Sequence, residues 1–304
     1  TTWSICKMNM LLHGIPQSDI RQEDTIRHPQ HKADSGELKR FDRVLANPPF
    51  SQNYIKKEIE YPGRFAVWLP EKGKKADLMF VQHMLAVLKA DGKMATIMPH
   101  GVLFRSGEEK EARKHFIERG WLEAIIGLPA GLFYGTGIPA CVLVMNKLEA
   151  ATRKHILFIN ADREYREGKA QNFLRPEDVS KIVHAYREHR DVPAYARLVP
   201  VSEIAAEIGG EIAALLHQHG RQAERGDLGI AHVHARRVAA RGGPQAFLLA
   251  LDLAIALRRP GPAPVRRAAG LIGDHRRRRF QPRGRRMDWP TPHQPSDAGS
   301  PGPC

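Results

Sequence analysis

The amino-acid sequence predicts an α/β fold in which a mostly parallel sheet is covered by helices on both faces. Apolar segments of strand length alternate with amphipathic segments of helix length over much of the chain. The strand segments are continuously apolar, which is typical of strands buried on both sides of a parallel sheet. The segments 121–128 and 138–146 have no helix between them. We therefore expect these two segments to form an antiparallel pair at one end of the sheet.

The first forty residues predict a helix, a short strand and a loop. Trp3, Met8 and Leu11 recur at helical spacing, and Gly14 is a typical residue at which a helix ends. The segment SDIRQEDTI is interpreted as a short strand that ends near Asp24. Residues 28–40 are expected to form a polar loop.

The next part of the chain continues the alternation after a strand with the sequence FDRVLA. Residues 51–76 are rich in Lys, Gly and Pro and predict a long irregular loop, which is often functional. The segment DLMFVQHMLAVLKADG predicts a helix that Asp77 caps or precedes and that Gly92 follows. The remaining assignments, in order, are strand KMATIMP, helix GEEKEARKHFIERG, strands WLEAIIGLP, IPACVLVMNK and HILFINA, and helix RPEDVSKIVHAYREH with Pro176 near its first turn.

Composition places the chain among ordinary globular proteins, with 304 residues of which 42% are hydrophobic. The three cysteines are far apart, which favours a reducing compartment such as the cytoplasm. No signal peptide or membrane-spanning segment is predicted, since the longest apolar run, 247–257, is short and contains Asp252. The chain opens at Thr1 without an initiator methionine, so we expect a fragment of a longer protein.

The net charge of +14 is concentrated at the end of the chain. Residues 1–218 contain 31 basic and 27 acidic residues, whereas residues 219–304 contain 16 arginines and 6 acidic residues. The total charge is therefore no argument that the core binds nucleic acid. The end of the chain also lacks Lys, Asn and Tyr. Three interpretations stay open: a disordered basic tail, an arginine-rich arm that binds phosphates, or a GC-rich gene read out of frame after about residue 206.

The segment LANPPF contains the most informative residues of the sequence. Pro48 and Pro49 end the preceding strand, because proline cannot donate a backbone hydrogen bond to a sheet. A simple turn is one interpretation, since Asn-Pro often opens a turn. The other is a ligand site at the carboxyl end of a strand, where open α/β sheets bind their ligands.

The order of the flanking segments supports the second interpretation. After the helical segment TTWSICKMNMLLHG come a strand ending in an acid, the strand with Asn-Pro-Pro-Phe, ADLMFVQHML, GKMATIMPHGVLF and LEAIIGLPAGLFYGTGIPACVLVMNK. This order resembles the DNA methyltransferase subunit of type I restriction–modification systems, from Thr1 to about Ile204. The resemblance implies a Rossmann-like sheet, and adenine-N6 methylation with S-adenosyl-L-methionine (SAM). It also implies that DNA, a specificity subunit and a restriction subunit are partners.

The resemblance assigns catalytic roles to Asn47, Pro48, Pro49 and Phe50. Adenine N6 is a poor nucleophile, because its lone pair is delocalised into the ring. Two acceptors on the amino hydrogens, the Asn47 side-chain oxygen and the Pro48 carbonyl, are expected to draw the nitrogen toward tetrahedral geometry. The prolines hold that carbonyl rigidly. Phe50 is expected to stack on an adenine flipped out of the duplex.

The resemblance suggests that Asp24 and Asn47 contact the methyl donor SAM, with Asp24 on the amino group of the SAM adenine. The alternative for Asp24 is an N-cap role. The family's glycine-rich SAM loop and ribose-binding acid fall before Thr1, so we expect the chain alone to bind SAM poorly and to be inactive. The expected organisation is a methyltransferase core lacking its first strand (1–150), an extension of that domain (151–206) and an Arg/Pro/Ala/Gly-rich tail (207–304).

Other features are less specific. The glycine-rich loop 131–137 is interpreted as a hairpin connection, with a role in lining the DNA or cofactor side as the alternative. Lysines in the long loop are either solvated or in contact with DNA phosphates: Lys56, Lys57, Lys72, Lys74 and Lys75. The histidine pairs at 217–219 and 232–234 lack cysteine or acidic neighbours, so no metal site is predicted. A protein glutamine methyltransferase and a non-catalytic fragment that binds nucleic acid or assembles with other subunits stay open as alternative functions.

Overall fold

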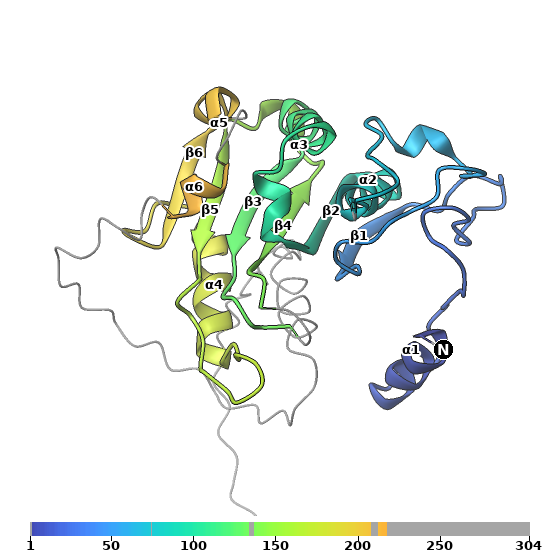
Figure 1. Cartoon of the computed structure of the whole chain (residues 1–304), viewed down its shortest axis with the longest axis horizontal. Helices are drawn as coiled ribbons and strands as arrows, with labels where there is room; N and C mark the ends of the chain where they lie inside the picture. Colours follow the sequence, from blue (N-terminus) through green and yellow to red (C-terminus); the bar gives the residue numbers. More distant parts are fainter. Residues whose placement is uncertain (1, 74, 134–136, 208–211, 218–304) are drawn as a thin grey trace, which may run out of the picture. The chain divides into compact units, whose positions relative to one another are not determined.

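A six-stranded sheet with helices on both faces forms the centre of the protein in a computed structural model (Figure 1). The structure describes residues 2–73, 75–133, 137–207 and 212–217. The chain divides into two units, 1–259 and 260–304, and all described residues belong to the first. The sheet has the order β1-β2-β4-β3-β5-β6. Its strands are β1 (Phe41–Ala46), β2 (Leu88–Pro99), β3 (Leu122–Gly127), β4 (Ala140–Asn146), β5 (His155–Asn160) and β6 (Ala196–Pro200).

Four of the six strands run in the same direction. Strand β1 pairs parallel with β2, and β3 pairs parallel with β5. Strand β4 runs antiparallel to both β2 and β3, and β6 runs antiparallel to β5. The predicted α/β class and the antiparallel pairing of β3 with β4 are confirmed. The predicted position of that pair at one end of the sheet was wrong, because β3 also pairs with β5 on its other side. The antiparallel strand at the sheet edge is β6.

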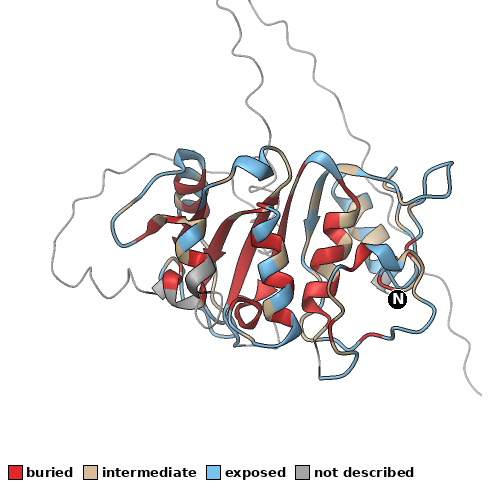
Figure 2. Cartoon of the chain, turned by 90° about the horizontal axis from the view of Figure 1, so that it is seen from above, coloured by how far each residue is buried: buried red, intermediate tan, exposed pale blue. Residues whose placement is uncertain are grey.

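The central strands β2, β3, β4 and β5 are largely buried on both faces, and their side chains alternate between two apolar clusters, whereas the edge strand β1 has no fully buried residue. In β2, Met94 and Met98 belong to one cluster, whereas Ala95 and Ile97 belong to the other. Helices α2 (Asp77–Ala86) and α3 (Glu108–Glu118) contribute to the first cluster, and α4 (Pro176–Glu188) contributes to the second. Figure 2 shows the buried strands between the inward faces of these helices, whose outward faces are exposed. This layering is what the continuously apolar strand segments predict.

The predicted helices are present with small changes in their bounds. Helix α2 starts at Asp77 itself, whose predicted place at the cap is taken by Ala76, and it ends at Ala86, since the residues from Leu88 onward belong to β2. In α4, Pro176 occupies the first turn, and the Asp178 carboxylate accepts a hydrogen bond from the Arg175 backbone amide at 2.8 Å. Short helical segments complete the described chain: η1 (Pro62–Arg64), η2 (His100–Leu103), η3 (Ala150–Thr152), α5 (Val201–Glu207) and α6 (Ile212–His217).

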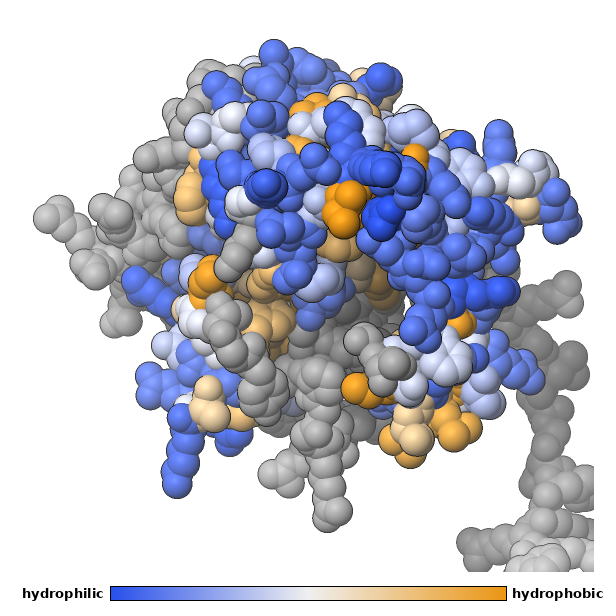
Figure 3. Space-filling model, turned by 45° about the vertical axis from the view of Figure 1, so that its right-hand side comes forward, coloured by the Kyte–Doolittle hydropathy of each residue, from blue (hydrophilic) through white to orange (hydrophobic). Residues whose placement is uncertain are grey.

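The N-terminal helix α1 (Thr2–Leu12) is also confirmed, and Gly14 follows it with a positive φ of 74°. Its apolar side chains are exposed, with 60% of Met8 and 77% of Leu12 accessible to solvent. The space-filling view in Figure 3 shows such apolar residues within a mostly hydrophilic face. No helix among the described residues is long and apolar enough to cross a membrane.

The segment SDIRQEDTI does not form the predicted strand. Its residues are extended or in turns, and no strand in the described part of the chain pairs with them. A strand needs a neighbour for its backbone hydrogen bonds, and apolar alternation alone does not supply one. The tail predicted for 207–304 lies almost entirely outside the described residues. Within its described part, Ile212, Leu215 and Leu216 of α6 are buried.

Candidate active site at the carboxyl ends of the strands

The carboxyl ends of four strands meet at one edge of the sheet. Because β1, β2, β3 and β5 run in the same direction, they end together at Ala46, Pro99, Gly127 and Asn160. Asn47–Phe50 follows β1 directly at this edge. This is the location at which α/β sheets of this kind bind ligands, since loops there can approach a ligand without disturbing the sheet.

The four predicted catalytic residues form one short segment between β1 and the long loop. Asn47 and Pro49 are exposed, whereas Pro48 and Phe50 are half-buried. The two proline rings fix their own φ angles and restrict the residue that precedes each of them. The Pro48 carbonyl is therefore held in a nearly fixed direction, next to an exposed amide side chain. Such a pair of acceptors suits a ligand that presents two N–H donors.

Phe50 contacts a second aromatic ring from a different part of the sheet edge. Its ring centroid lies 5.6 Å from that of Phe133, with an interplanar angle of 69°. Both rings pack against the apolar cluster that includes Ile97 and Leu132. The hairpin interpretation of the loop after β3 is confirmed by the pairing of β3 with β4. The sequence analysis did not identify Phe133 as a site residue, although its place in the glycine-rich loop was a signal for one. Residues 134–136 of that loop lie outside the described residues.

The backbone reverses immediately after Phe50. Ser51 has a φ of 54°, which is left-handed and costs a residue other than glycine about 1–2 kcal/mol. Its backbone N–H donates to Oδ1 of Asp77 at 2.8 Å. The Gln52 side chain donates to the Phe50 carbonyl at 3.1 Å, and the Ala76 N–H donates to the Gln52 carbonyl at 3.0 Å. Contacts with the start of α2 therefore fix the backbone that directly follows the Asn47–Phe50 segment.

A pocket of about 280 Å³ lies at the carboxyl ends of β3 and β5, and none of Asn47–Phe50 lines it. It opens over the ends of β3 and β5 and the start of η2. Its polar lining comes from two connections, with His100 between β2 and α3 and the other polar residues at the end of β5 and before α4. The lining includes His100, Gly127, Ala130, Asn160, Asp162, Tyr165 and Asn172.

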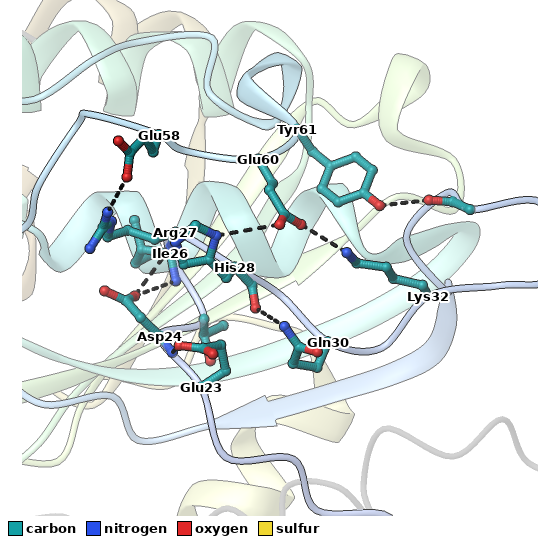
Figure 4. A network of polar contacts seen from close by, with 12 residues as sticks. Glu23, Asp24, Ile26, Arg27, His28, Gln30, Lys32, Glu58, Glu60 and Tyr61 are labelled. Atoms are coloured by element: carbon teal, nitrogen blue, oxygen red, sulfur yellow. Dashed lines mark hydrogen bonds and ion pairs between the residues drawn. The ribbon is translucent and has the colours of Figure 1, made fainter.

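Asp24, the predicted contact for the methyl donor, caps its own turn. Its Oδ1 accepts hydrogen bonds from the backbone N–H groups of Ile26 at 2.9 Å and Arg27 at 3.2 Å. Figure 4 shows this turn within a network of ion pairs, in which Arg27 contacts Glu58. The capping alternative for Asp24 is therefore present in the structure, although its exposed carboxylate keeps further capacity to accept hydrogen bonds.

Arg64 joins the Asp24 turn to the long loop and to α2. This arginine is 8% exposed and donates to the carbonyls of Thr25, Ile26, Glu60 and Tyr61 at 2.6–3.1 Å. Burial lowers its pKa to about 10.

The fifth contact of Arg64 is Nδ1 of His83, at 2.6 Å. Because arginine only donates, this nitrogen is the unprotonated acceptor of the imidazole. Burial and the neighbouring Arg64 charge lower the pKa of His83 to about 4. Sequence reasoning missed both residues.

Asp24 and Asn47 are held at opposite ends of α2. The Asn47 segment is anchored through Ser51 to Asp77, at the first turn of the helix. The Asp24 turn is anchored through Arg64 to His83, about 9 Å further along the helix axis. The two residues are therefore anchored at separate points along α2, and their contacts with the methyl donor stay a prediction.

The remaining candidates have surface roles or ion pairs in the described chain. Lys56 lies 4.4 Å from the centre of the Trp68 ring, and Lys57 is largely exposed beside Glu58. Lys75 pairs with Glu109 at 3.6 Å, whereas Lys74 lies outside the described residues. Contacts of these lysines with DNA stay a prediction. No group of histidine, cysteine or acidic residues suited to a metal occurs in the part of the chain that the structure describes.

Comparison with known proteins identifies the family to which the chain is similar. The family model described as N-6 DNA Methylase matches residues 1–208. The type I restriction enzyme MjaVIII methylase subunit of Methanocaldococcus jannaschii is 35% identical over 214 residues, which cover 66% of this chain and 36% of that protein. The MpnII methylase subunit of Mycoplasma pneumoniae is 31% identical and covers 67% of this chain and 39% of its own length. The chain thus spans well under half of these relatives.

A solved structure agrees with these relatives. The type I restriction–modification methyltransferase subunit from Streptococcus thermophilus superposes with a TM-score of 0.62 at 33% identity, covering 69% of this chain and 45% of that one. The sheet and the Asn47–Phe50 segment lie within the residues that the family model matches. The chain belongs to the N-6 DNA methylase family.

Proposed function

We propose that the chain is the central part of the methylase subunit of a type I restriction–modification system, and that Asn47–Phe50 is its adenine-N6 methylation site. The observation that carries this proposal is the position of Asn-Pro-Pro-Phe directly after β1, at the edge where the strands end. The match to the family supports it, as does the similarity to subunits named type I restriction enzyme methylases.

In this proposal, the segment activates the exocyclic amine of a flipped adenine. The Asn47 side-chain oxygen and the Pro48 carbonyl each accept one N6–H hydrogen bond, which draws N6 toward tetrahedral geometry and localises its lone pair. Because the prolines hold the carbonyl in place, little reorganisation is needed when charge develops on N6. The N6–methyl bond forms as the sulfonium–methyl bond breaks, and N6 then releases a proton to solvent.

The aromatic rings hold the base. Phe50 is half-buried and offers a ring face next to the acceptors, where stacking with a base is worth about 1–3 kcal/mol. Phe133 supports that ring from the loop after β3, with its ring edge-on to that of Phe50. Both rings tolerate any base, and the two acceptors require an exocyclic amine, which adenine, cytosine and guanine carry and thymine lacks.

S-adenosylmethionine is the proposed methyl donor, since it is the sulfonium that the family resemblance implies. Asn47 faces the edge of the sheet where the donor must meet the base. A contact of Asp24 with the donor's adenine would use the capacity to accept hydrogen bonds that its exposed carboxylate keeps beside the capping contacts. Asp24 therefore enters the proposal as a residue to test separately.

The proposed partners are DNA, a specificity subunit that reads the target sequence, and a restriction subunit. The relatives are named as methylase subunits of type I enzymes, and this supports assembly with other subunits.

The test is to identify the methylated product. A full-length methylase that carries this core is incubated with DNA and isotopically labelled SAM, and the DNA is then digested to nucleosides. Labelled N6-methyladenine is the expected product. Labelled N4-methylcytosine, or label only on protein glutamine, would refute the proposal, and the second result would favour a protein methyltransferase.

A further inference from the structure

Asp77 lies behind the Asn47–Phe50 segment and contacts none of the groups that the proposed reaction uses. Its side chain is 1% exposed, at the first residue of α2. Oδ1 accepts the Ser51 backbone N–H at 2.8 Å, and Oδ2 accepts Nη1 of Arg105 at 3.1 Å. One buried carboxylate thus joins the residue that follows Phe50 to the segment between η2 and α3.

Arg105 is itself fixed by its surroundings. Its Nη1 also donates to Oε1 of Glu109 at 3.2 Å, and Glu109 is fully buried in the first turn of α3. The second oxygen of Glu109 lies 3.6 Å from Nζ of Lys75. Two buried carboxylates and two cations therefore balance each other, and this removes the cost of an unpaired buried charge.

Arg105 packs against the backbone on one side. A Cβ atom at Gly101 would lie 2.6 Å from Nε of Arg105, so the guanidinium runs directly over the backbone of η2. The Arg105 backbone N–H donates to the Gly101 carbonyl at 3.1 Å. Although 31% of the Arg105 side chain is exposed, its contacts with two buried carboxylates hold Asp77 on one side, while the other oxygen of Asp77 accepts the Ser51 amide.

The bond to Ser51 matters because of the backbone conformation there. Ser51 has a positive φ, which serine adopts only when its surroundings enforce it. A change of that angle rotates the peptide before it and moves the Phe50 ring and the Pro48 carbonyl relative to β1. In catalysis, a misplacement of about 1 Å can reduce the rate by a factor of about a hundred.

We propose that Asp77, held by Arg105, is a positioning residue that sets the direction of the Pro48 carbonyl and the Phe50 ring by fixing the Ser51 amide. The expected effect on methyl transfer rests on the proposed function, whereas the role of Asp77 in fixing the Ser51 amide does not depend on it. The competing interpretation is that Asp77 only stabilises the first turn of α2, as an acid at a helix N-terminus does.

Asp178 provides a matched control. It is also an aspartate that is 1% exposed in the first turn of a helix, and it also pairs with an arginine, with Oδ1 2.8 Å from Nη2 of Arg175. Its contacts stay within the start of α4. Replacing either aspartate therefore removes a helix-terminal acid, but only Asp77→Ala or Asp77→Asn affects Ser51.

The first measurement is hydrogen exchange of the Ser51 amide in the 304-residue chain. We expect exchange at least tenfold faster in Asp77→Ala, severalfold faster in Asp77→Asn, and unchanged in Asp178→Ala. The isosteric asparagine keeps the measurement possible if the alanine variant unfolds. Exchange in a folded Asp77 variant that matches the wild-type rate would overturn the proposal.

The second measurement is methyl transfer by a full-length methylase that carries this core. Asp77→Asn should lower kcat tenfold or more and leave KM for DNA within twofold, whereas Asp178→Asn should leave both values within twofold. Equal loss of kcat in the two variants would refute a positioning role. Absence of methylation by the wild type would refute the proposed function, and the Ser51 exchange would still decide whether Asp77 fixes the segment.

Discussion

Replacing Phe50 by alanine tests whether its ring binds a base. Stacking of one base on an aromatic side chain contributes about 1–3 kcal/mol. Phe50 is half-buried and meets Phe133 at 5.6 Å, so one side of the ring is already in contact with protein. We therefore expect the lower part of the range, about 1–2 kcal/mol, which corresponds to a loss of about 5- to 30-fold in capture of the flipped base.

The replacement also has a structural cost that must be measured separately. The contact between Phe50 and Phe133 contributes about 0.5–1.5 kcal/mol to folding, as aromatic pairs of this geometry do. Thermal unfolding of Phe50→Ala should therefore show a small decrease in Tm. Phe41→Ala serves as a control, because Phe41 is a half-buried phenylalanine at the other end of β1.

The assay is the fluorescence of 2-aminopurine placed at the target adenine, which increases when the base leaves the stack. Phe50→Trp and Phe50→Tyr should retain capture, since both keep a ring face, whereas Phe50→Ala should lose it. Phe41→Ala should retain capture. If Phe50→Ala and Phe50→Trp give the same fluorescence change, Phe50 serves only in packing and the stacking role is refuted.

Three further predictions concern the rest of the chain. Arg64→Met should lower the free energy of unfolding by about 2–4 kcal/mol in urea titrations, because four carbonyls and His83 lose a buried donor. Replacing the exposed Arg21 by methionine is the control and should change the free energy of unfolding by less than about 0.5 kcal/mol. His83 has a folded-state pKa of about 4, below its ordinary 6.5, so the unfolded state binds the proton first, and stability should be full above pH 6.5 and decrease toward pH 4. His83→Gln should flatten that decrease in stability; an unchanged decrease would exclude the buried neutral histidine as its cause. If the residues after about 206 are out of frame, translation of the other two frames of the gene should yield methylase-like sequence, and its absence from both would favour a genuine basic tail.

Local patterns in the sequence were sufficient for most of the elements. The helices α2, α3 and α4 each have an apolar face and a recognisable first turn, so their starts were predicted closely. The strand before Asn47 was predicted because two prolines mark its end. The candidate segment Asn47–Phe50 followed from the same residues, since it is contiguous in sequence.

Features that depend on distant contacts were not predicted. The place of β4 between β2 and β3 depends on which strand edges pair, and this is not encoded in the strand itself. The segment before Asp24 has strand-like composition but lacks a partner among the described residues. Arg64 is a charged residue in a loop, and only the fold shows that it is buried and binds four carbonyls. A single sequence does not distinguish such an arginine from a solvated one.

The central claim is that the side chain of Asn47 activates the adenine amine, and the rate of methyl transfer in Asn47→Ala tests it most directly. The measurement is a single-turnover reaction with labelled SAM, in a full-length methylase that carries this core, with DNA binding measured in parallel. We predict a rate lower by about a hundredfold or more, because one preorganised acceptor is removed, with little change in DNA affinity. A rate like that of the wild type would contradict the assignment of the active site.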